Sequence, residues 1–215
     1  MIDIEELENS KVPRGEVSLV GLGRLGLRTA LNLIQTHRGG PKTVYAIDGQ
    51  KISIDDLIFR MYGAEINEYK VDFLKRFAGE GFHKEIIPIT QNITSKNLEL
   101  IKGDVVCIEI AGGDTLKTSS EIIQYAHSQG ALTVSTLGVF GIGEEEIIVK
   151  DISELETDNP IVESLKNEGI TDNHLLIGTG KLIRDWEPVT PYTLDLISNI
   201  ITREVLKLLK KKTDK

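Results

Sequence analysis

The sequence predicts an α/β fold: a Rossmann-like, doubly wound and mainly parallel sheet with added C-terminal strands and a long final helix. Apolar, β-branched segments alternate with amphipathic helical segments from residue 16 to residue 136. A glycine-rich turn joins the first apolar segment to the first helical one. Because 215 residues with 40% hydrophobic content suit one body, we expect residues 1–215 to form a single domain. Its core would span 16–136, with 140–215 as an extension of the same body.

Nearly continuous apolar character predicts strands that are covered by helices on both faces of the sheet. The five predicted core strands cover residues 16–21, 43–48, 84–89, 104–110 and 132–136. The pattern changes after about residue 140, where residues 144–150 and 174–180 indicate two later strands. We expect these two as antiparallel additions at the edge of the sheet.

Helical spacing of apolar residues follows the glycine turn, where Leu27, Leu31 and Ile34 share one face. A second helix is predicted over 67–79, capped by Asn67. A third helix is predicted over 119–129, because Thr118 and Glu121 have the spacing of a capping box at its start. The final helix, over 190–212, carries apolar residues on more than one side. It is therefore expected to pack on the sheet and on a second copy, as a homodimer.

Composition excludes several classes of function. The formal net charge of -8 and the pI of about 5.1 disfavour nucleic acid as a partner. The single cysteine, Cys107, excludes a disulfide framework and a cysteine-rich zinc site. The acidic N-terminus lacks an apolar signal region, and no apolar run approaches a membrane span. We expect a soluble, cytoplasmic protein without zinc.

The stretch "VGLGRLG" places Gly21, Gly23 and Gly26 in a G-x-G-x-x-G arrangement between a strand and a helix. The first glycine allows a tight turn, the second lets the backbone approach a phosphate, and the third lets helix and strand pack closely. Asp48 ends the second strand, where an acid can hydrogen-bond ribose hydroxyls. This arrangement predicts a nucleotide site, but it fits NAD and ATP equally well; a purely structural turn is the alternative.

A basic cluster after Asp48 favours a triphosphate over a dinucleotide. Lys51, Arg60 and Lys70 all follow the second strand. If Asn67 caps the next helix, Lys70 lies in its first turn, where a cation opposes the helix dipole. That placement indicates a bound anion, with an ordinary solvated lysine as the alternative.

Together, "VGLGRLG", "YAIDGQKISIDDLIFR" and "INEYK" resemble the ThiF/MoeB family, the relatives of ubiquitin-activating enzymes. On this resemblance Asp48, Asp56, Arg60 and Lys70 match family positions after the second strand, and Asp114 matches a later aspartate. The chain departs from the family pattern at several positions: Gln50 replaces a second aspartate, Asp56 an asparagine and Met61 a glutamine. Arg24 also replaces a loop glycine, and the paired zinc cysteines are absent.

The resemblance implies adenylation of a carboxylate by ATP and Mg²⁺, with release of pyrophosphate. Arg60, Lys70 and Asp114 are the implied catalytic residues, with Asp114 also the metal ligand. The implied ATP-binding residues are Gly21, Gly23, Arg24, Gly26, Asp48, Lys51 and Asp56. In relatives a neighbouring subunit supplies an arginine; Lys11 or Arg14 is the candidate here.

Within the family, the chain is similar to members from methanogenic archaea that act in iron-guanylylpyridinol ([Fe]-hydrogenase) cofactor biosynthesis. Their implied substrate is the carboxyl group of guanylylpyridinol, with a downstream protein as a candidate acyl acceptor. The C-terminal carboxylate of a ubiquitin-like sulfur carrier is the alternative substrate. Because Cys107 lies within an apolar strand, we expect the chemistry to stop at an acyl-adenylate, without a thioester.

Two rival functions remain open at this stage. An NAD-dependent dehydrogenase would need a catalytic region with a histidine or lysine acid–base, and none is evident after residue 140. A non-catalytic nucleotide-binding module would keep the glycines and Asp48 but would need neither Lys70 nor Asp114.

Overall fold

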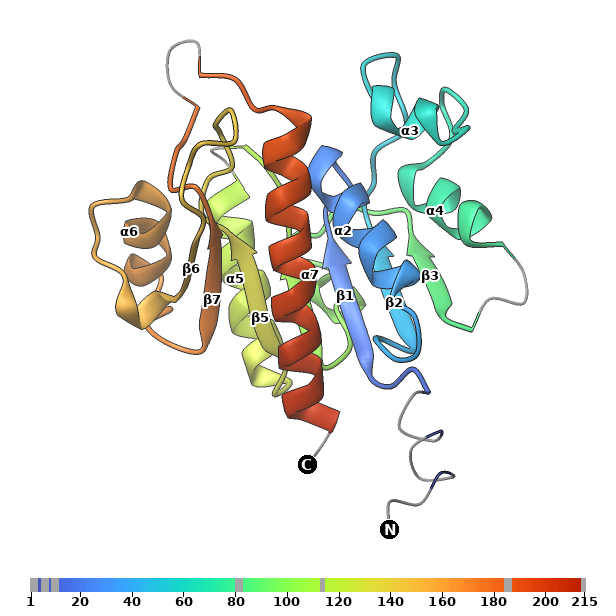
Figure 1. Ribbon diagram of the computed structural model, residues 1–215. Coiled ribbons are helices and arrows are strands. Elements are labelled where there is room, and N and C mark those ends of the chain that lie inside the picture. Colours follow the sequence, from blue (N-terminus) through green and yellow to red (C-terminus); the bar gives the residue numbers. More distant parts are fainter. Residues whose placement is uncertain are drawn as a thin grey trace.

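The computed structural model describes residues 4, 8, 12–79, 83–112, 115–183 and 187–213 (Figure 1). Its strands are β1 (Glu16–Val20), β2 (Thr43–Ile47), β3 (Glu85–Ile89), β4 (Val105–Ile108), β5 (Leu132–Thr136), β6 (Ile148–Asp151) and β7 (His174–Gly178). They form a seven-stranded sheet in the order β3-β2-β1-β4-β5-β7-β6. The described residues therefore confirm the Rossmann-like, mainly parallel fold, and one sheet takes strands from both the predicted core and its extension.

All neighbouring strands are parallel except β6 and β7. The prediction of antiparallel edge strands is therefore correct for β6 and wrong for β7, which runs parallel to β5. The helix α6 (Pro160–Asn167) between β6 and β7 explains the difference, because it brings the chain to the amino-terminal end of the sheet before β7 begins. As a result, β7 can pair with β5 in the same direction as the core strands.

The remaining helices are α2 (Arg24–Gln35), α3 (Leu57–Met61), α4 (Lys70–Ala78), α5 (Thr115–Ser128) and α7 (Pro191–Thr213). The described residues also hold two short 3₁₀ turns, η1 (Leu98–Leu100) and η2 (Ile152–Glu154). The predicted cap at Asn67 is wrong: Asn67 has a left-handed backbone with φ 73°, and α4 begins three residues later. Thr118 is likewise not a cap, because it lies inside α5.

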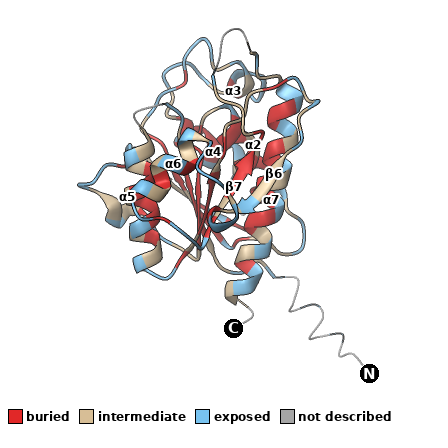
Figure 2. Ribbon diagram, turned by 90° about the vertical axis from the view of Figure 1, so that its left-hand side faces the viewer, coloured by how far each residue is buried: buried red, intermediate tan, exposed pale blue. Residues whose placement is uncertain are grey.

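Helices cover both faces of the sheet, with the buried strands between them (Figure 2). Alternation along β4 shows how the sequence produces two cores. Val105 and Cys107 belong to the core that includes residues of α2, α4 and α7. Val106 and Ile108 belong to the core that includes residues of α5 and α6. A strand that is apolar at every position is needed because both of its faces are covered.

The final helix α7 packs on β4, β5, β7 and α2. Arg28 of α2 forms a 2.5 Å ion pair with Asp195 of α7, and Asn32 donates to Asn199 at 3.2 Å. Contacts within the chain thus account for apolar residues on more than one side of α7. The homodimer stays a prediction, since packing within one chain already explains the pattern that motivated it. No helix among the described residues is long and apolar enough to cross a membrane.

Candidate active site

The sheet changes its winding direction between β1 and β4, and a cavity of about 470 Å³ opens there at the carboxyl ends of the strands. Ligands of open α/β sheets bind at such switch points. The cavity is lined by Val20, Gly21, Gly23, Ile47, Asp48, Gln50, Asn92, Ile93, Glu109, Ile110, Ala111, Thr115 and Thr118. Three of the predicted binding residues, Gly21, Gly23 and Asp48, are thus brought together at one site.

The three loop glycines have different surroundings. A Cβ added at Gly21, where φ is 98°, would lie 2.7 Å from the backbone oxygen of Glu109. A Cβ at Gly26 would lie only 2.0 Å from the backbone oxygen of Gly21. A Cβ at Gly23 would meet nothing within 4 Å. The expected tight turn and close packing are confirmed for Gly21 and Gly26, whereas Gly23 leaves space open on the side of the cavity.

The helix α2 begins directly after Gly23, and no side chain caps its first turn. Its first backbone N–H groups have no partner within the helix, and the positive end of the helix dipole lies beside them. This arrangement at the edge of the cavity suits a bound phosphate.

The carboxylate of Asp48 holds the glycine loop in place. It accepts hydrogen bonds from the backbone N–H groups of Leu22 and Gln50, each at 2.7 Å. Asp48 is only 8% exposed, and these two bonds compensate its buried charge. Each oxygen keeps a further lone pair, and Asp48 lines the cavity. Contact with a ribose therefore remains a prediction beside this structural role.

Lys70 is buried, 5% exposed, at the first residue of α4. Its Nζ donates to Oε1 of Gln50 at 2.9 Å and lies 3.4 Å from the carboxylate of Asp56. Burial opposes ionisation of Asp56, but hydrogen bonds from Ser53 and the charge of Lys70 outweigh it and lower the pKa of Asp56. Gln50 lines the cavity, and its side chain separates the Lys70 ammonium from it. The ammonium is paired with Asp56 instead.

The other predicted cations stand outside the cavity lining and are exposed. Arg60 of α3, a helix that lies beyond the carboxyl ends of the strands (Figure 1), donates to the carbonyl of Ile54 at 3.1 Å. Lys51 places its Nζ 4.8 Å from the ring centre of Tyr69. Arg24 begins α2. Their contacts with a nucleotide stay predictions.

Two predicted residues, Lys11 and Asp114, lie outside the described residues. Arg14 precedes β1, and its backbone N–H donates to the carbonyl of Gly40 at 2.9 Å. It is therefore at the amino-terminal end of the sheet, opposite the cavity of its own chain, so only the site of a neighbouring copy remains open to it.

Glu109, which the sequence analysis did not single out, is one of the residues that line the cavity. It is 7% exposed; Oε1 accepts from the Cys107 thiol at 3.3 Å, and Oε2 has no partner among the described residues. Burial raises the pKa of Glu109 to about 7. An acidic residue inside the apolar stretch 104–110 was the available signal.

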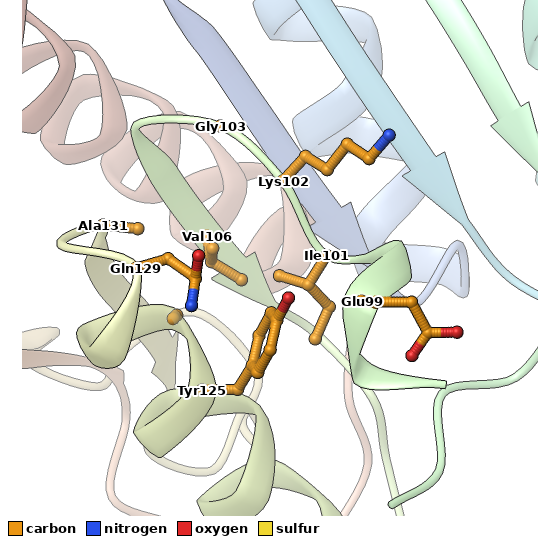
Figure 3. A pocket seen from close by; sticks show the side chains of 9 residues that line it. Glu99, Ile101, Lys102, Gly103, Val106, Tyr125, Gln129 and Ala131 are labelled. Atoms are coloured by element: carbon orange, nitrogen blue, oxygen red, sulfur yellow. The ribbon is translucent and has the colours of Figure 1, made fainter. Parts of the chain in front are cut away.

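A separate hollow of about 360 Å³ lies at the amino-terminal end of β4, beside η1 and α5. Figure 3 shows Tyr125 and Ile101 at this hollow, while the charged groups of Glu99 and Lys102 extend away from it. It is at the opposite end of β4 from the glycine loop, and it contains none of the predicted site residues.

Comparison with solved structures identifies the family. The guanylylpyridinol- and ATP-bound HcgE from Methanothermobacter marburgensis matches with a TM-score of 0.91 and 60% sequence identity. The match covers 94% of this chain and 98% of that chain. The chain belongs to the HcgE family. No protein-family model matches it.

One further relative and one further solved structure are also similar to the chain. The uncharacterized protein MJ0693 of Methanocaldococcus jannaschii is 46% identical to this HcgE-family chain over 208 residues, which are 97% of this chain and 82% of the relative. The E. coli tRNA N6-threonylcarbamoyladenosine dehydratase TcdA, in complex with ATP, matches with a TM-score of 0.77 at 14% identity, covering 98% of this chain and 91% of that chain. The likeness to TcdA shows the fold alone, which is the expected ThiF-like Rossmann fold.

The glycines of this HcgE-family chain give a matched pair of variants. Gly26→Ala should lower the free energy of unfolding by about 1–3 kcal/mol, because its Cβ overlaps the Gly21 carbonyl. Gly23→Ala should leave stability within about 0.5 kcal/mol but weaken ATP binding, because its Cβ projects into open space at the cavity. Urea unfolding and ATP calorimetry measure the two effects. Unchanged ATP affinity in a folded Gly23→Ala variant would exclude phosphate contact there.

The variant Glu109→Gln tests the raised pKa of the buried carboxyl group, and the experiment needs no nucleotide. The pKa of Glu109 is raised to about 7 from 4.5, so the folded state binds more protons than the unfolded state between these values. The stability that Glu109 contributes is therefore present at pH 4 and lost as the pH rises through 7. Urea unfolding should show equal stability of both proteins at pH 4.5 and a variant more stable by on the order of 3 kcal/mol at pH 8.5. A pH-independent difference would contradict the raised pKa.

Proposed function

We propose that the protein catalyses ATP-dependent adenylation of the carboxyl group of guanylylpyridinol, giving an acyl-adenylate and pyrophosphate. One observation carries this proposal. A nucleotide-type cavity lies at the switch point of a chain that is 60% identical to an HcgE bound to both guanylylpyridinol and ATP. The reaction would belong to biosynthesis of the iron-guanylylpyridinol cofactor in methanogens.

In this reaction the substrate carboxylate attacks the α-phosphorus of ATP, and the bond to the pyrophosphate oxygen breaks. Negative charge gathers on the phosphate oxygens, so fixed donors must already face them. The uncapped first turn of α2 beside Gly23 supplies backbone N–H groups. The carboxylate of Asp48, at the end of β2, is the proposed partner of the ribose hydroxyls.

Lys70 is the proposed source of positive charge beside the phosphates. Its ammonium is already desolvated, and its partner Gln50 lines the cavity. Charge–charge attraction is stronger at such a buried position than at the surface. Arg60 is proposed as a second cation, with Arg24 and Lys51 as further phosphate contacts; each would have to turn inward from its exposed position.

Mg²⁺ fits the residues that are present. The described residues hold no group of three acidic or histidine side chains, but Mg²⁺ bound to ATP needs only one or two carboxylates besides phosphate and water. Asp114 is the predicted ligand, and Glu109, which lines the cavity, is a candidate second carboxylate. Its Oε2, which has no partner among the described residues, is buried, so the side chain would have to turn toward the cavity to reach the ion. When bound, Mg²⁺ neutralises charge on the phosphate oxygens.

Cys107 is unsuited to carry an acyl group. Its side chain is fully buried, and burial, together with the neighbouring Glu109, raises the pKa of the thiol well above its usual range. A thiolate, the form that attacks an acyl-adenylate, is therefore disfavoured. The acyl-adenylate would instead stay in the site until another protein or a small nucleophile accepts it. A homodimer is the proposed assembly.

Exchange of labelled pyrophosphate into ATP tests the reaction directly. Exchange should require guanylylpyridinol, and a guanylylpyridinol whose carboxyl group is esterified should not support it, because it lacks the attacking oxygen. Cys107→Ala should retain this exchange. No exchange with the free carboxylate, or a covalent adduct on Cys107, would reject the proposal. Tight NADH binding in a parallel titration without ATP binding would favour a dehydrogenase instead.

Lys70→Ala should weaken ATP binding or turnover by about 1.5–3 kcal/mol, which is about 10–150-fold. The physical reason is the loss of a desolvated cation beside the cavity. Lys75→Ala, which removes an exposed lysine from the last turn of the same helix, is the matched control. Calorimetry and exchange rates measure both variants. Equal behaviour of the two variants would remove Lys70 from the site.

A further inference from the structure

A second cavity of about 480 Å³ adjoins the nucleotide cavity at the carboxyl ends of β4 and β5. The two cavities share Ile110, Ala111 and Thr115, so a molecule in one can reach the other across this common wall. The walls of the second cavity are mostly apolar, with Ile108, Ile110, Leu116, Val139, Phe140 and Leu165 among them. Such walls suit a flat, weakly polar ring.

Four of the described residues that line this cavity carry hydroxyl groups, and one of them, Thr136, has its side chain on the opposite face of β5 from Ser135. Ser119 donates to the carbonyl of Thr115 at 3.0 Å, and Thr115 donates to the carbonyl of Gly112 at 2.6 Å. Ser135 of β5 differs, because its hydrogen-bond partner is a ring nitrogen of His174 rather than a backbone oxygen. Ser135 is 7% exposed and also lines the cavity.

A chain of buried hydrogen bonds runs from Ser135 along the sheet. The ring of His174, fully buried in β7, lies between two hydroxyls of β5: Ser135 Oγ is 2.8 Å from its Nε2, and Thr133 Oγ1 is 2.8 Å from its Nδ1. Nε2 of His127, on α5, lies 2.9 Å from the same Thr133 hydroxyl. Strand register produces the arrangement, because Thr133 pairs with His174 and Ser135 follows on the same face.

The distances assign the hydrogens along this chain. Burial lowers the pKa of His174 to about 3, so its ring is neutral and carries one N–H. Nε2 of His127 also lies 3.2 Å from the carbonyl of Asn173, which can only accept, so this nitrogen carries a hydrogen and does not accept from Thr133. The hydrogen of Thr133 is then left with Nδ1 of His174 at 2.8 Å and the carbonyl of Asn173 at 3.4 Å. Because O–H···O bonds are normally about 2.5–3.0 Å long, the Asn173 carbonyl is too distant, and Thr133 donates to Nδ1. The N–H then lies on Nε2 and donates to Ser135, whose own hydrogen is left for the cavity.

We propose that Ser135 is the specificity-determining donor of a ring-binding subsite, and that His174 is the residue that positions it. Resting on the proposed function, this inference places the pyridinol ring of the substrate in the second cavity. The Ser135 hydroxyl donates to the ring nitrogen or to the ring oxygen. The carboxyl group then reaches the nucleotide cavity past the shared wall at Ile110 and Thr115.

Calorimetry with guanylylpyridinol tests the donor. Ser135→Ala should weaken binding by about 2–10-fold, the effect of one neutral hydrogen bond. Ser120→Ala is the matched control, since Ser120 is a buried serine that donates to the carbonyl of Leu116 and lines neither cavity. It should retain wild-type affinity, and ATP affinity should be unchanged in both variants.

Two variants at Thr133, which does not line the cavity, and an NMR measurement test whether His174 positions the Ser135 hydroxyl. Thr133→Val removes the donor to Nδ1 and should weaken guanylylpyridinol binding, whereas Thr133→Ser keeps that donor and should restore it. In the wild type, ¹⁵N NMR of the imidazole should place the His174 proton on Nε2. This measurement needs no substrate.

The outcomes separate this inference from the proposed function. Wild-type binding and pyrophosphate exchange together with unchanged affinity in Ser135→Ala would overturn the subsite and leave the proposed function standing. A proton on Nδ1 of His174 would also overturn it, because the Ser135 hydrogen would then be used by the ring. An equal loss of ATP affinity in Ser135→Ala would show general damage and count against the subsite. A wild type that does not bind guanylylpyridinol would reject both proposals.

Discussion

The close approach of the glycine loop to the end of β4 is the constraint on which the rest of the site depends. Gly21 lies against the backbone of Glu109, and Gly26 lies against the carbonyl of Gly21. Side chains at either position would separate the loop from the sheet. The carboxylate of Asp48 completes the arrangement by holding the N–H of Leu22. Because these contacts fix where α2 begins, they also fix the direction of its free N–H groups and the position of the cavity.

The electrostatics of the cavity follow from how each buried acid is compensated. The chain is acidic overall, yet its proposed ligand is an anion. Asp48 is compensated by two N–H groups, and Asp56 by Lys70 and Ser53. Glu109 lacks such a partner for one oxygen, and the pKa of Glu109 rises to about 7 as a result of burial. Its carboxyl therefore carries less negative charge near pH 7 than an ordinary glutamate does, which limits repulsion of phosphate.

Local sequence patterns predicted those parts of the fold that depend on local chemistry. The five core strands lie within one or two residues of their predicted ranges, because strands buried on both faces need continuous apolar character. The roles of Gly21 and Gly26 were predictable because turn and packing constraints act within a few residues. The direction of β7, the short helices α3 and α6, and the start of α4 depend on tertiary contacts that leave little trace in local periodicity.

The candidate site was predictable to a smaller extent for the same reason. Gly23 and Asp48 were found through a motif, whereas Glu109 and Gln50 reach the cavity only because β2 and β4 end beside β1. Lys70 was found through its place in a first turn, but not its pairing with Asp56. The pairing of Ser135 with His174 joins residues 39 positions apart, and no local pattern announces it.

The two cavities use different parts of one sheet, and this division has a consequence for specificity. The nucleotide cavity is built mainly on β1, β2 and the end of β4, while the second cavity is built on β5, α5 and α6. Their common wall is formed by Ile110 and Ala111, which follow β4, and by Thr115, which begins α5. Substitutions on β5 or α6 can therefore alter the second ligand while the glycine loop and Asp48 stay unchanged. Specificity for the carboxylate partner is thus expected to depend on β5, where Ser135 lies, more than on the glycine loop.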